Sequence, residues 1–287
     1  MASLREVIQQ THRLLESSGI PDARLEAEVL VMDLMAMRRH DIYANQEAEV
    51  GAPREQELDR KVERRLKREP LAYILGHWEF YGINLLVTPA VLIPRPETET
   101  LVEHALFLAL MGIETPQLAI ADAGTGSGAI AISMAIHLPA ARIHALDASD
   151  GALDVASYNV RAHNVADRVK LGKGDLLEPL TDPVDLIVAN LPYIPSKRIA
   201  TLQPEIQWEP REALDGGPDG LDPIRRLLSQ APGKLKDQGI ILLELDPEQV
   251  PVVEELVQRC LPEATTSVEQ DLARLDRILV INRGGGE

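Results

Sequence analysis

The sequence predicts a mainly parallel α/β sheet with helices on both faces, preceded by a small helical bundle. From about residue 97, short apolar runs alternate with helical stretches, which is typical of parallel strands joined by crossover helices. The first seventy residues instead carry helix-start signals and apolar residues at helical spacing. A short segment rich in aromatic residues and glycine lies between these parts. We therefore expect three regions, at residues 1–75, 76–94 and 95–283.

The amino-terminal region has clear helix boundaries. Ser3-Leu4-Arg5-Glu6 fits a capping box, in which the hydroxyl and the carboxylate satisfy free amides of the first turn. A second helix is expected to open at Pro21-Asp22. A third is expected to begin near Pro53, because proline suits a first helical turn, and to end at Glu69-Pro70. These signals predict a small helical bundle over residues 1–75.

The segment 76–94 is expected to form a linking β-hairpin. Glycine at positions 76 and 82 stands among residues that favour strands. The chain has two Trp, five Tyr and two Phe, and four of these nine fall close together, at Tyr73, Trp78, Phe80 and Tyr81. Such a cluster more often packs than binds, so packing is the preferred interpretation, with ligand stacking as the alternative.

The remaining region supplies the sheet. Apolar runs at 118–121, 142–146, 168–171, 184–189, 239–245 and 275–281 are expected strands, with helices after Glu97, Ser127, Asp150, Asp222 and Glu248. No helical pattern fills TTSVEQDLARLD, the stretch just before the last run. The last two runs are therefore expected to pair antiparallel.

Composition excludes several classes of protein. The net charge of −16 over 287 residues argues against binding dominated by nucleic-acid phosphates or by anionic membranes, although Arg60–Arg68 is a local basic run. With Cys260 as the one cysteine, a disulfide framework and a thiolate zinc cluster are excluded. The seven histidines lack metal-ligand spacing, so no metal site is expected. No signal peptide or membrane span is visible, which predicts a cytoplasmic protein.

A glycine-rich turn follows the first apolar run of the sheet region. Asp122–Gly128 reads DAGTGSG, and alternating glycines allow a tight turn and a close approach of ligand to backbone. Such a loop can also be purely structural. Nineteen residues after Gly128, Asp147 ends the next expected strand, where a carboxylate can accept hydrogen bonds from a ribose diol. Together these features predict a nucleoside site.

Ribose binding alone leaves a dinucleotide and S-adenosylmethionine as alternatives. Dinucleotide loops usually space their glycines GxGxxG so that the helix start holds a pyrophosphate, whereas this loop reads GxGxG after Asp122. The spacing resembles the first motif of Rossmann-like methyltransferases. Gly174-Asp175-Leu176, after the third run, is similar to the adenine-contacting segment of that family, with Asp175 as acceptor for the exocyclic amine.

A second unusual loop, Asn190-Leu191-Pro192-Tyr193, follows the fourth run. It resembles the (N/D)PPY loops of methyltransferases that modify nitrogens conjugated to a π system. The Asn190 side-chain oxygen and the Leu191 carbonyl can hold two N–H groups, Pro192 stiffens the loop, and Tyr193 can pack on the planar group. The alternative is a strand-end turn in which Asn caps and Tyr fills the core.

Longer segments narrow the resemblance. REPLAYILG (68–76), VLIPRPETE (91–99), EPREAL (209–214) and Gly220-Leu221 are similar to the bacterial protein-glutamine methyltransferases, which modify the glutamine of the GGQ loop in peptide chain release factors. The resemblance covers nearly the whole chain. This sequence departs from the family pattern at Leu191, where NPPY has proline, at Leu176, often aromatic, and at Asp246, where glycine is expected.

The resemblance implies a Rossmann-like S-adenosylmethionine-dependent methyltransferase with a mainly parallel seven-stranded sheet, releasing S-adenosylhomocysteine. It implies a release factor as protein substrate, with no membrane and no required nucleic acid, and we expect a monomer. The catalytic residues would be Asn190, Leu191, Pro192 and Tyr193. The cofactor residues would be Asp122, Gly124, Thr125, Gly126, Ser127, Gly128, Asp147, Asp175, Leu176, Asn190, Arg95 and Glu97.

Alternatives to that function are transfer to an adenine amine of RNA or DNA, to a glutamine of a ribosomal protein, or a non-catalytic cofactor-binding role in translation. Acidity and the lack of an added nucleic-acid domain oppose the first of these. Because a glutamine side chain is small and common, selection needs a second contact surface. We expect residues 1–75 to dock the protein substrate, with the basic run steering an acidic partner surface; a solvated helix face is the plainer alternative.

Overall fold

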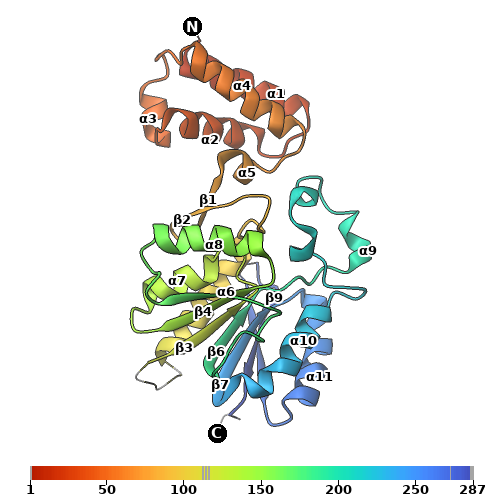
Figure 1. Ribbon diagram of the computed structural model, residues 1–287. Coiled ribbons are helices and arrows are strands. Elements are labelled where there is room, and N and C mark those ends of the chain that lie inside the picture. Colours follow the sequence, from red (N-terminus) through yellow and green to blue (C-terminus); the bar gives the residue numbers. More distant parts are fainter. Residues whose placement is uncertain (1, 112, 114, 116, 272, 285–287) are drawn as a thin grey trace. The chain divides into compact units, whose positions relative to one another are not determined.

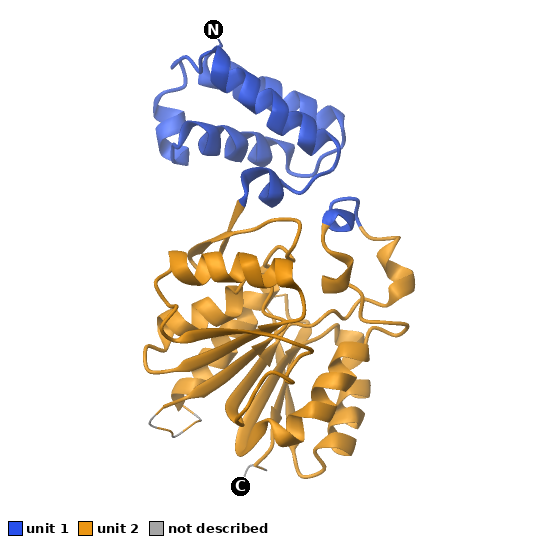
Figure 2. Ribbon diagram, in the orientation of Figure 1, with its two compact units in different colours: residues 1–76, 203–208 blue, residues 77–202, 209–287 orange. Residues whose placement is uncertain are grey.

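The computed structural model describes residues 2–111, 113, 115, 117–271 and 273–284 (Figure 1). The chain divides into two compact units (Figure 2). Unit 1 comprises Met1–Gly76 together with Gln203–Trp208, and unit 2 comprises His77–Leu202 and Glu209–Glu287. Sequence reasoning placed 203–208 inside the sheet region, so its grouping with the helical unit is a difference from expectation.

Unit 1 is helical. Its helices are α1 (Leu4–Ser17), α2 (Ala23–Met35), α3 (Arg39–Ala44), α4 (Ala52–Leu66) and α5 (Leu71–Leu75), with the 3-10 turn η1 (Ile206–Trp208). The predicted capping box is present, since Glu6 N donates to Ser3 Oγ and Ser3 N donates to the Glu6 carboxylate. Buried aliphatic residues such as Leu4, Leu15 and Leu30 form its core. The short helices α3 and α5 were missed, because neither carries a full helical repeat.

Most cations of the basic run are used inside unit 1. Arg65 is 3% exposed and bonds to the carboxylates of Glu26, at 2.6 and 3.1 Å, and of Glu205, at 3.0 Å. Arg68 also donates to Glu205, at 3.2 Å. Lys61 pairs with Asp33 and Arg64 with Glu69. The run therefore stabilises the helical unit and its inserted segment, while Arg60, Arg64 and Lys67 stay exposed. That the run steers an acidic partner surface stays a prediction.

Unit 2 begins with the predicted hairpin. Strands β1 (His77–Phe80) and β2 (Ile83–Leu86) pair antiparallel around Tyr81-Gly82, both of which have positive φ. Phe80 is buried in the core of the unit, so for this aromatic residue the prediction of packing is confirmed. The rest of the segment, 87–94, runs as irregular chain toward α6 (Pro96–Met111).

The main sheet has seven strands in the order β5-β4-β3-β6-β7-β9-β8. Five strands are mutually parallel: β3 (Ala119–Ala123), β4 (Arg142–Asp147), β5 (Val169–Lys173), β6 (Val184–Ala189) and β7 (Leu235–Glu244). β9 (Asp276–Asn282) pairs antiparallel with β7, as predicted for the last two apolar runs. β8 (Thr265–Gln270) was missed; it is a polar, half-exposed edge strand against β9.

Helices cover both faces of the sheet (Figure 1). α6, α7 (Ala129–His137) and α8 (Asp150–Ala162) contribute to one core, and α10 (Asp222–Gln230) and α11 (Val250–Cys260) to the other. Successive strand residues alternate between the two cores, as Ile120 and Ala121 show. Nearly continuous apolar strands buried on both faces are the reason that the sequence pattern indicated a parallel sheet.

The strand order reverses between β3 and β6, which are direct neighbours. The chain goes from β3 outward to β4 and β5, then returns to the other side of β3 with β6. At such a switch point the loops at the carboxyl ends of the strands diverge and leave a crevice for a ligand. The glycine-rich turn and the Asn190 loop both begin there.

Candidate active site

The glycine-rich turn needs its glycines. Gly124, Gly126 and Gly128 have φ of +76°, +56° and +83°, a left-handed region that side chains disfavour. The backbone amides of Gly124 and Thr125 both donate to the Leu146 carbonyl, at 2.8 and 2.9 Å. The turn is thereby tied to β4, and its spacing follows from backbone geometry.

Asp122 lies beneath this turn. It is fully buried, and its Oδ2 accepts hydrogen bonds from Thr125 Oγ1 at 2.6 Å and from Ala131 N at 3.1 Å. Its Oδ1 has no hydrogen-bond partner among the described residues. Burial raises the pKa of Asp122 to about 7, and the negative charge of Asp147 adds to the effect. Asp122 thus holds the turn in place through Oδ2, while its Oδ1 is left without a hydrogen-bond partner among the described residues.

Asp147 ends β4 with both carboxylate oxygens engaged by backbone. Oδ2 accepts from Gly126 N and Oδ1 from Ser149 N, each at 2.9 Å. Ser149 in turn caps α8 by accepting from Ala152 N. Because each carboxylate oxygen has two lone pairs, Asp147 keeps acceptor capacity for a diol while its orientation is fixed.

The loop after β5 carries Asp175 and Leu176. Asp175 lies 3.3 Å from Arg226 and accepts a long hydrogen bond, 3.5 Å, from Gln230. Leu176 has φ of +54°, a left-handed conformation that costs a non-glycine residue on the order of 1 kcal/mol. Residues held this way concentrate at ligand sites, which supports the assignment of this loop to the pocket.

The Asn190 loop is packed from two sides. The Leu191 side chain is 3% exposed, and its Cδ2 lies 3.0 Å from the position that a Cβ on Gly124 would occupy. Leucine in place of proline therefore fills the space above Gly124. Gln249 donates to the Tyr193 carbonyl at 2.9 Å, and Tyr193 packs against the core formed with α10 and α11.

The Asn190 side chain is held by a chain of hydrogen bonds. Asn190 Nδ2 donates to Thr98 Oγ1 at 2.8 Å, and Thr98 Oγ1 donates to Glu244 Oε2 at 2.7 Å. Thr98 comes from the first turn of α6 and Glu244 from the end of β7. Burial raises the pKa of Glu244 to about 7.

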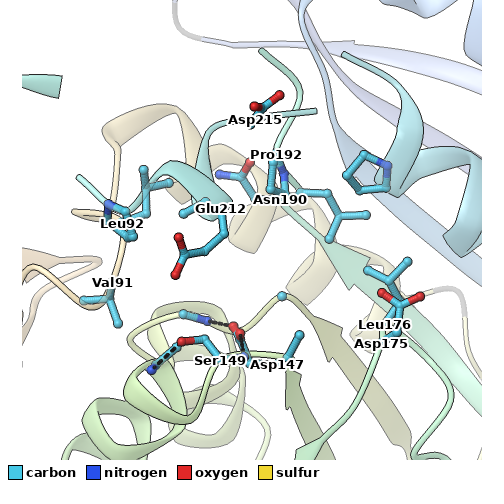
Figure 3. Close-up of a pocket in the computed structure, with 18 of the residues that line it drawn as sticks. Val91, Leu92, Asp147, Ser149, Asp175, Leu176, Asn190, Pro192, Glu212 and Asp215 are labelled. Carbon is cyan, nitrogen blue, oxygen red and sulfur yellow. Dashed lines mark hydrogen bonds between the residues drawn. The ribbon is translucent and has the colours of Figure 1, made fainter. Parts of the chain in front are cut away.

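A cavity of about 360 Å³ lies at this edge of the sheet (Figure 3). Its lining combines ends of four strands with Val91 and Leu92 and with the segment that precedes α10. In Figure 3 the Glu212 carboxylate projects into the space between Val91–Leu92 and Asp147. The predicted site residues on its wall are Gly124, Gly126, Asp147, Asp175, Leu176, Asn190, Leu191 and Pro192.

The cavity has an acidic wall. It is lined by the carboxylates of Asp147, Asp175, Glu212 and Asp215 against the one guanidinium of Arg226. A hydrogen bond from Ser196, with further ones from Gly217 N and Arg211, lowers the pKa of Asp215, so this group is ionised at neutral pH. Such a lining favours a ligand with positive charge and disfavours a pyrophosphate.

Seven of the predicted site residues are not on the described cavity wall: Asp122, Thr125, Ser127, Gly128, Tyr193, Arg95 and Glu97. Arg95 instead pairs with the buried carboxylate of Glu209, which also accepts from Ile93 N at 3.1 Å. Glu209 thus fastens the chain segment that carries Val91 and Leu92. Glu97 acts at longer range, since its charge raises the pKa of Glu244.

Sequence reasoning missed Thr98, Glu244 and Glu212 as site residues. Thr98 lies within IPRPETE and Glu212 within EPREAL, two segments already singled out for their resemblance. Glu244 could have been predicted from the sequence, because a glutamate within the apolar run that ends in ILLELD is expected to be buried and then needs a hydrogen-bond partner.

Comparison with protein-family models agrees with this architecture. Residues 6–76 match the model of the PrmC N-terminal domain, and residues 103–217 match that of the methyltransferase small domain. Among solved structures, a methyltransferase from Pyrococcus furiosus is similar over 79% of this chain and 99% of its own, with 17% identity and a TM-score of 0.52. The human Mettl16 catalytic domain is similar over 82% and 83%, with 14% identity and a TM-score of 0.55. The fold and the match define a methyltransferase of the Rossmann-like class.

Full-length relatives identify the family. The release factor glutamine methyltransferase of Moorella thermoacetica is 41% identical over 282 residues, 98% of this chain and 99% of its own. That of Geobacter sulfurreducens is 42% identical, over 88% and 87%. The human MTRF1L release factor glutamine methyltransferase is 33% identical, over 99% and 89%. This chain belongs to the release factor glutamine methyltransferase family.

Two features are absent from the part of the chain that the structure describes. None of its helices combines the length and the apolarity that crossing a bilayer requires. Nor do its His, Cys, Asp and Glu side chains form a group of three or more suited to a metal ion.

Proposed function

We propose that this protein transfers a methyl group from S-adenosylmethionine to the side-chain amide nitrogen of the glutamine in the GGQ loop of peptide chain release factors, and so modulates translation termination. The observation that carries the proposal is the meeting of the glycine turn with the Asn190 loop at the β3/β6 switch point, around one acidic cavity. Family membership supplies the substrate class.

The residues present fit this cofactor. S-adenosylmethionine carries a sulfonium and an ammonium, which suit a wall where four carboxylates face one guanidinium. Asp147 offers acceptors for the ribose hydroxyls and Asp175 one for the adenine amine, while Asp122, which does not line the cavity, supports the glycine turn from beneath. When bound, the cofactor would supply a methyl group on positive sulfur: the amide nitrogen would bond to the methyl carbon as the carbon–sulfur bond breaks, leaving neutral S-adenosylhomocysteine and releasing one amide proton to solvent.

The Asn190 loop would hold the substrate amide. Its nitrogen is a weak nucleophile because the lone pair is delocalised, and the N–H becomes acidic only as the new bond forms. Two fixed acceptors, Asn190 Oδ1 and the Leu191 carbonyl, therefore serve better than a strong base, since they orient the nitrogen and stabilise growing positive charge. Pro192 stiffens the loop. Tyr193 would anchor the loop by packing against the core formed with α10 and α11.

Unit 1 would supply the second contact surface that selects one glutamine among many. Among its described residues the basic run keeps Arg60, Arg64 and Lys67 exposed, and Arg64 is already paired with Glu69. Docking would then depend on the shape of the helical bundle more than on electrostatic steering.

A labelled-methyl assay tests the proposal. Release factor, a ribosomal protein and RNA are offered separately to the full chain with S-adenosylmethionine carrying a labelled methyl. Label on the release factor glutamine, absent from a glutamine-to-alanine substrate, is the expected result. Label on RNA or on the ribosomal protein alone would contradict it, as would no transfer to any of the three.

A further inference from the structure

The Thr98 and Glu244 side chains connect Asn190 to the interior of unit 2. Thr98 is 5% exposed and Glu244 2% exposed, and the two hydrogen bonds of the chain measure 2.8 and 2.7 Å. Three elements far apart in sequence meet here, because Asn190 follows β6, Thr98 opens α6 and Glu244 ends β7.

The chemistry of these groups gives the chain a direction. An ionised carboxylate can only accept, so the Thr98 hydroxyl must donate its single proton to Glu244. Thr98 Oγ1 is then left as an acceptor, and the group that faces it from Asn190 must be the NH₂. The Asn190 oxygen, Oδ1, is therefore turned away from Thr98 and is the atom this side chain can offer to a ligand in the cavity that it lines.

We propose that Thr98 and Glu244 are positioning residues that select the side-chain orientation of Asn190, so that an acceptor and not a donor meets the substrate amide. The inference rests on the proposed function for its substrate. An Asn190 turned the other way would present its NH₂ to the N–H groups of glutamine, which is a repulsive donor–donor contact. A freely rotating Asn190 would be in the useful orientation only part of the time.

Substitutions at Thr98 separate this role from simple packing. Thr98→Val keeps the volume and removes the hydroxyl, Thr98→Ser keeps the hydroxyl, and Thr100→Val makes the same change at another buried threonine of α6 as a matched control. With release factor as substrate, Thr98→Val should lower kcat at least about tenfold with KM for the cofactor within about twofold. Thr98→Ser should stay within about threefold of the unaltered chain, and Thr100→Val should be unchanged.

A second readout does not depend on methyl transfer. The Asn190 Nδ2 protons, assigned in an amide NMR spectrum by their loss in Asn190→Ala, should exchange slowly with water in the unaltered chain and in Thr98→Ser. They should exchange at least about tenfold faster in Thr98→Val, because a hydrogen bond is lost. If Thr98→Val does not fold, Glu244→Gln takes its place. A glutamine side chain can donate as well as accept, so the Thr98 hydroxyl would no longer be forced to donate to residue 244 and the Asn190 side chain could take either orientation.

Several results would overturn the inference: equal kcat in Thr98→Val and Thr100→Val, failure of Thr98→Ser to restore turnover, or unchanged Nδ2 exchange in Thr98→Val. If the unaltered chain does not methylate release factor, the proposed function fails. The exchange rates still decide whether Thr98 holds Asn190.

Discussion

Asn190 donates its side-chain amide to the hydroxyl of Thr98, 2.8 Å away, although 92 residues separate the two in sequence. This contact joins the loop expected to hold the substrate with a segment that the sequence marks only by its resemblance to a family. It also separates two functions of the pocket, since Asp147 ends β4 and Asp175 follows β5, whereas the hydrogen-bond chain joins α6, the loop after β6 and the end of β7. Binding and turnover should therefore respond to different substitutions.

Replacing Asn190 should impair turnover and spare cofactor binding. Asn190→Ala removes one acceptor for the substrate amide, so kcat should fall at least about a hundredfold, the scale for one well-placed transition-state contact. The dissociation constant for S-adenosylmethionine, measured by calorimetry, should change little. Near-normal turnover with tight cofactor binding would remove Asn190 from the mechanism.

Replacing Asp147 should have the opposite effect. Asp147→Ala should cost roughly 1.5–3 kcal/mol of cofactor affinity, the range for hydrogen bonds to a charged group. The value should lie toward the upper end, because Asp147 also holds the amides of Gly126 and Ser149. Asp150→Ala is the control, an exposed carboxylate three residues away that pairs with Lys173. Calorimetry giving equal affinities for both variants would refute the ribose assignment.

Turnover should rise with pH through about 7. The pKa of Glu244 is raised to about 7, mainly by burial and also by the charge of Glu97, while Thr98, Arg277 and Arg95 act in the opposite direction. Burial, and after it the charge of Glu244, raises the pKa of Tyr193 to about 12, so the Tyr193 hydroxyl stays protonated. Only ionised Glu244 fixes the direction of the hydrogen-bond chain, so kcat should decline as Glu244 is protonated below pH 7.

The variant Glu244→Gln checks this origin. It should have lower kcat at high pH and lack the step near pH 7 in a plot of kcat against pH. A step that persists in Glu244→Gln would assign it to another group, of which Asp122, also with a pKa of about 7, is the first to test.

Folding stability should depend on Asp122 with a definite sign. Its pKa is 3.8 when unperturbed and about 7 when buried in the folded chain, so between these values the folded state binds the extra proton. The free energy of unfolding should therefore fall as pH rises from about 4 through about 7. Asp122→Asn should reduce the difference in Tm between about pH 5 and pH 8, whereas the exposed-site variant Asp150→Asn should keep it. Equal differences in both would show that Asp122 is not the group that titrates.

Much of unit 2 follows from its sequence. Asp122–Gly128 and Asp147 are local signals, since positive φ demands glycine and a strand end fixes a carboxylate at the sheet edge. Strand β8 was beyond reach because its polar residues at the sheet edge bury little and show weak periodicity. The partners of Asn190 were beyond reach for another reason. Which buried hydroxyl meets which buried carboxylate depends on packing between three elements, and no local pattern encodes it.

The basic run shows the same limit. As a string, Arg60–Arg68 suggests a surface for an acidic partner, yet Arg65 is among the most deeply buried charged residues of the chain. Its carboxylates come from Glu26, 39 residues earlier, and Glu205, 140 residues later. Charge composition is visible in a sequence, but the pairing of charges is a property of the fold.

The grouping of Gln203–Trp208 with the helical unit (Figure 2) affects how this protein can be taken apart. The polypeptide passes from one unit to the other three times, and the returning stretch leads directly to Pro210 and Glu212 on the cavity wall. A truncated chain that simply starts after Gly76 would keep Glu205 and lose Arg65 and Arg68, its two cationic partners. Chimaeras that exchange the helical unit between relatives would need to carry two pieces of chain together. In this architecture the module for recombination is discontinuous. A graft made only after Gly76 would combine the helices of one relative with the 203–208 segment of the other.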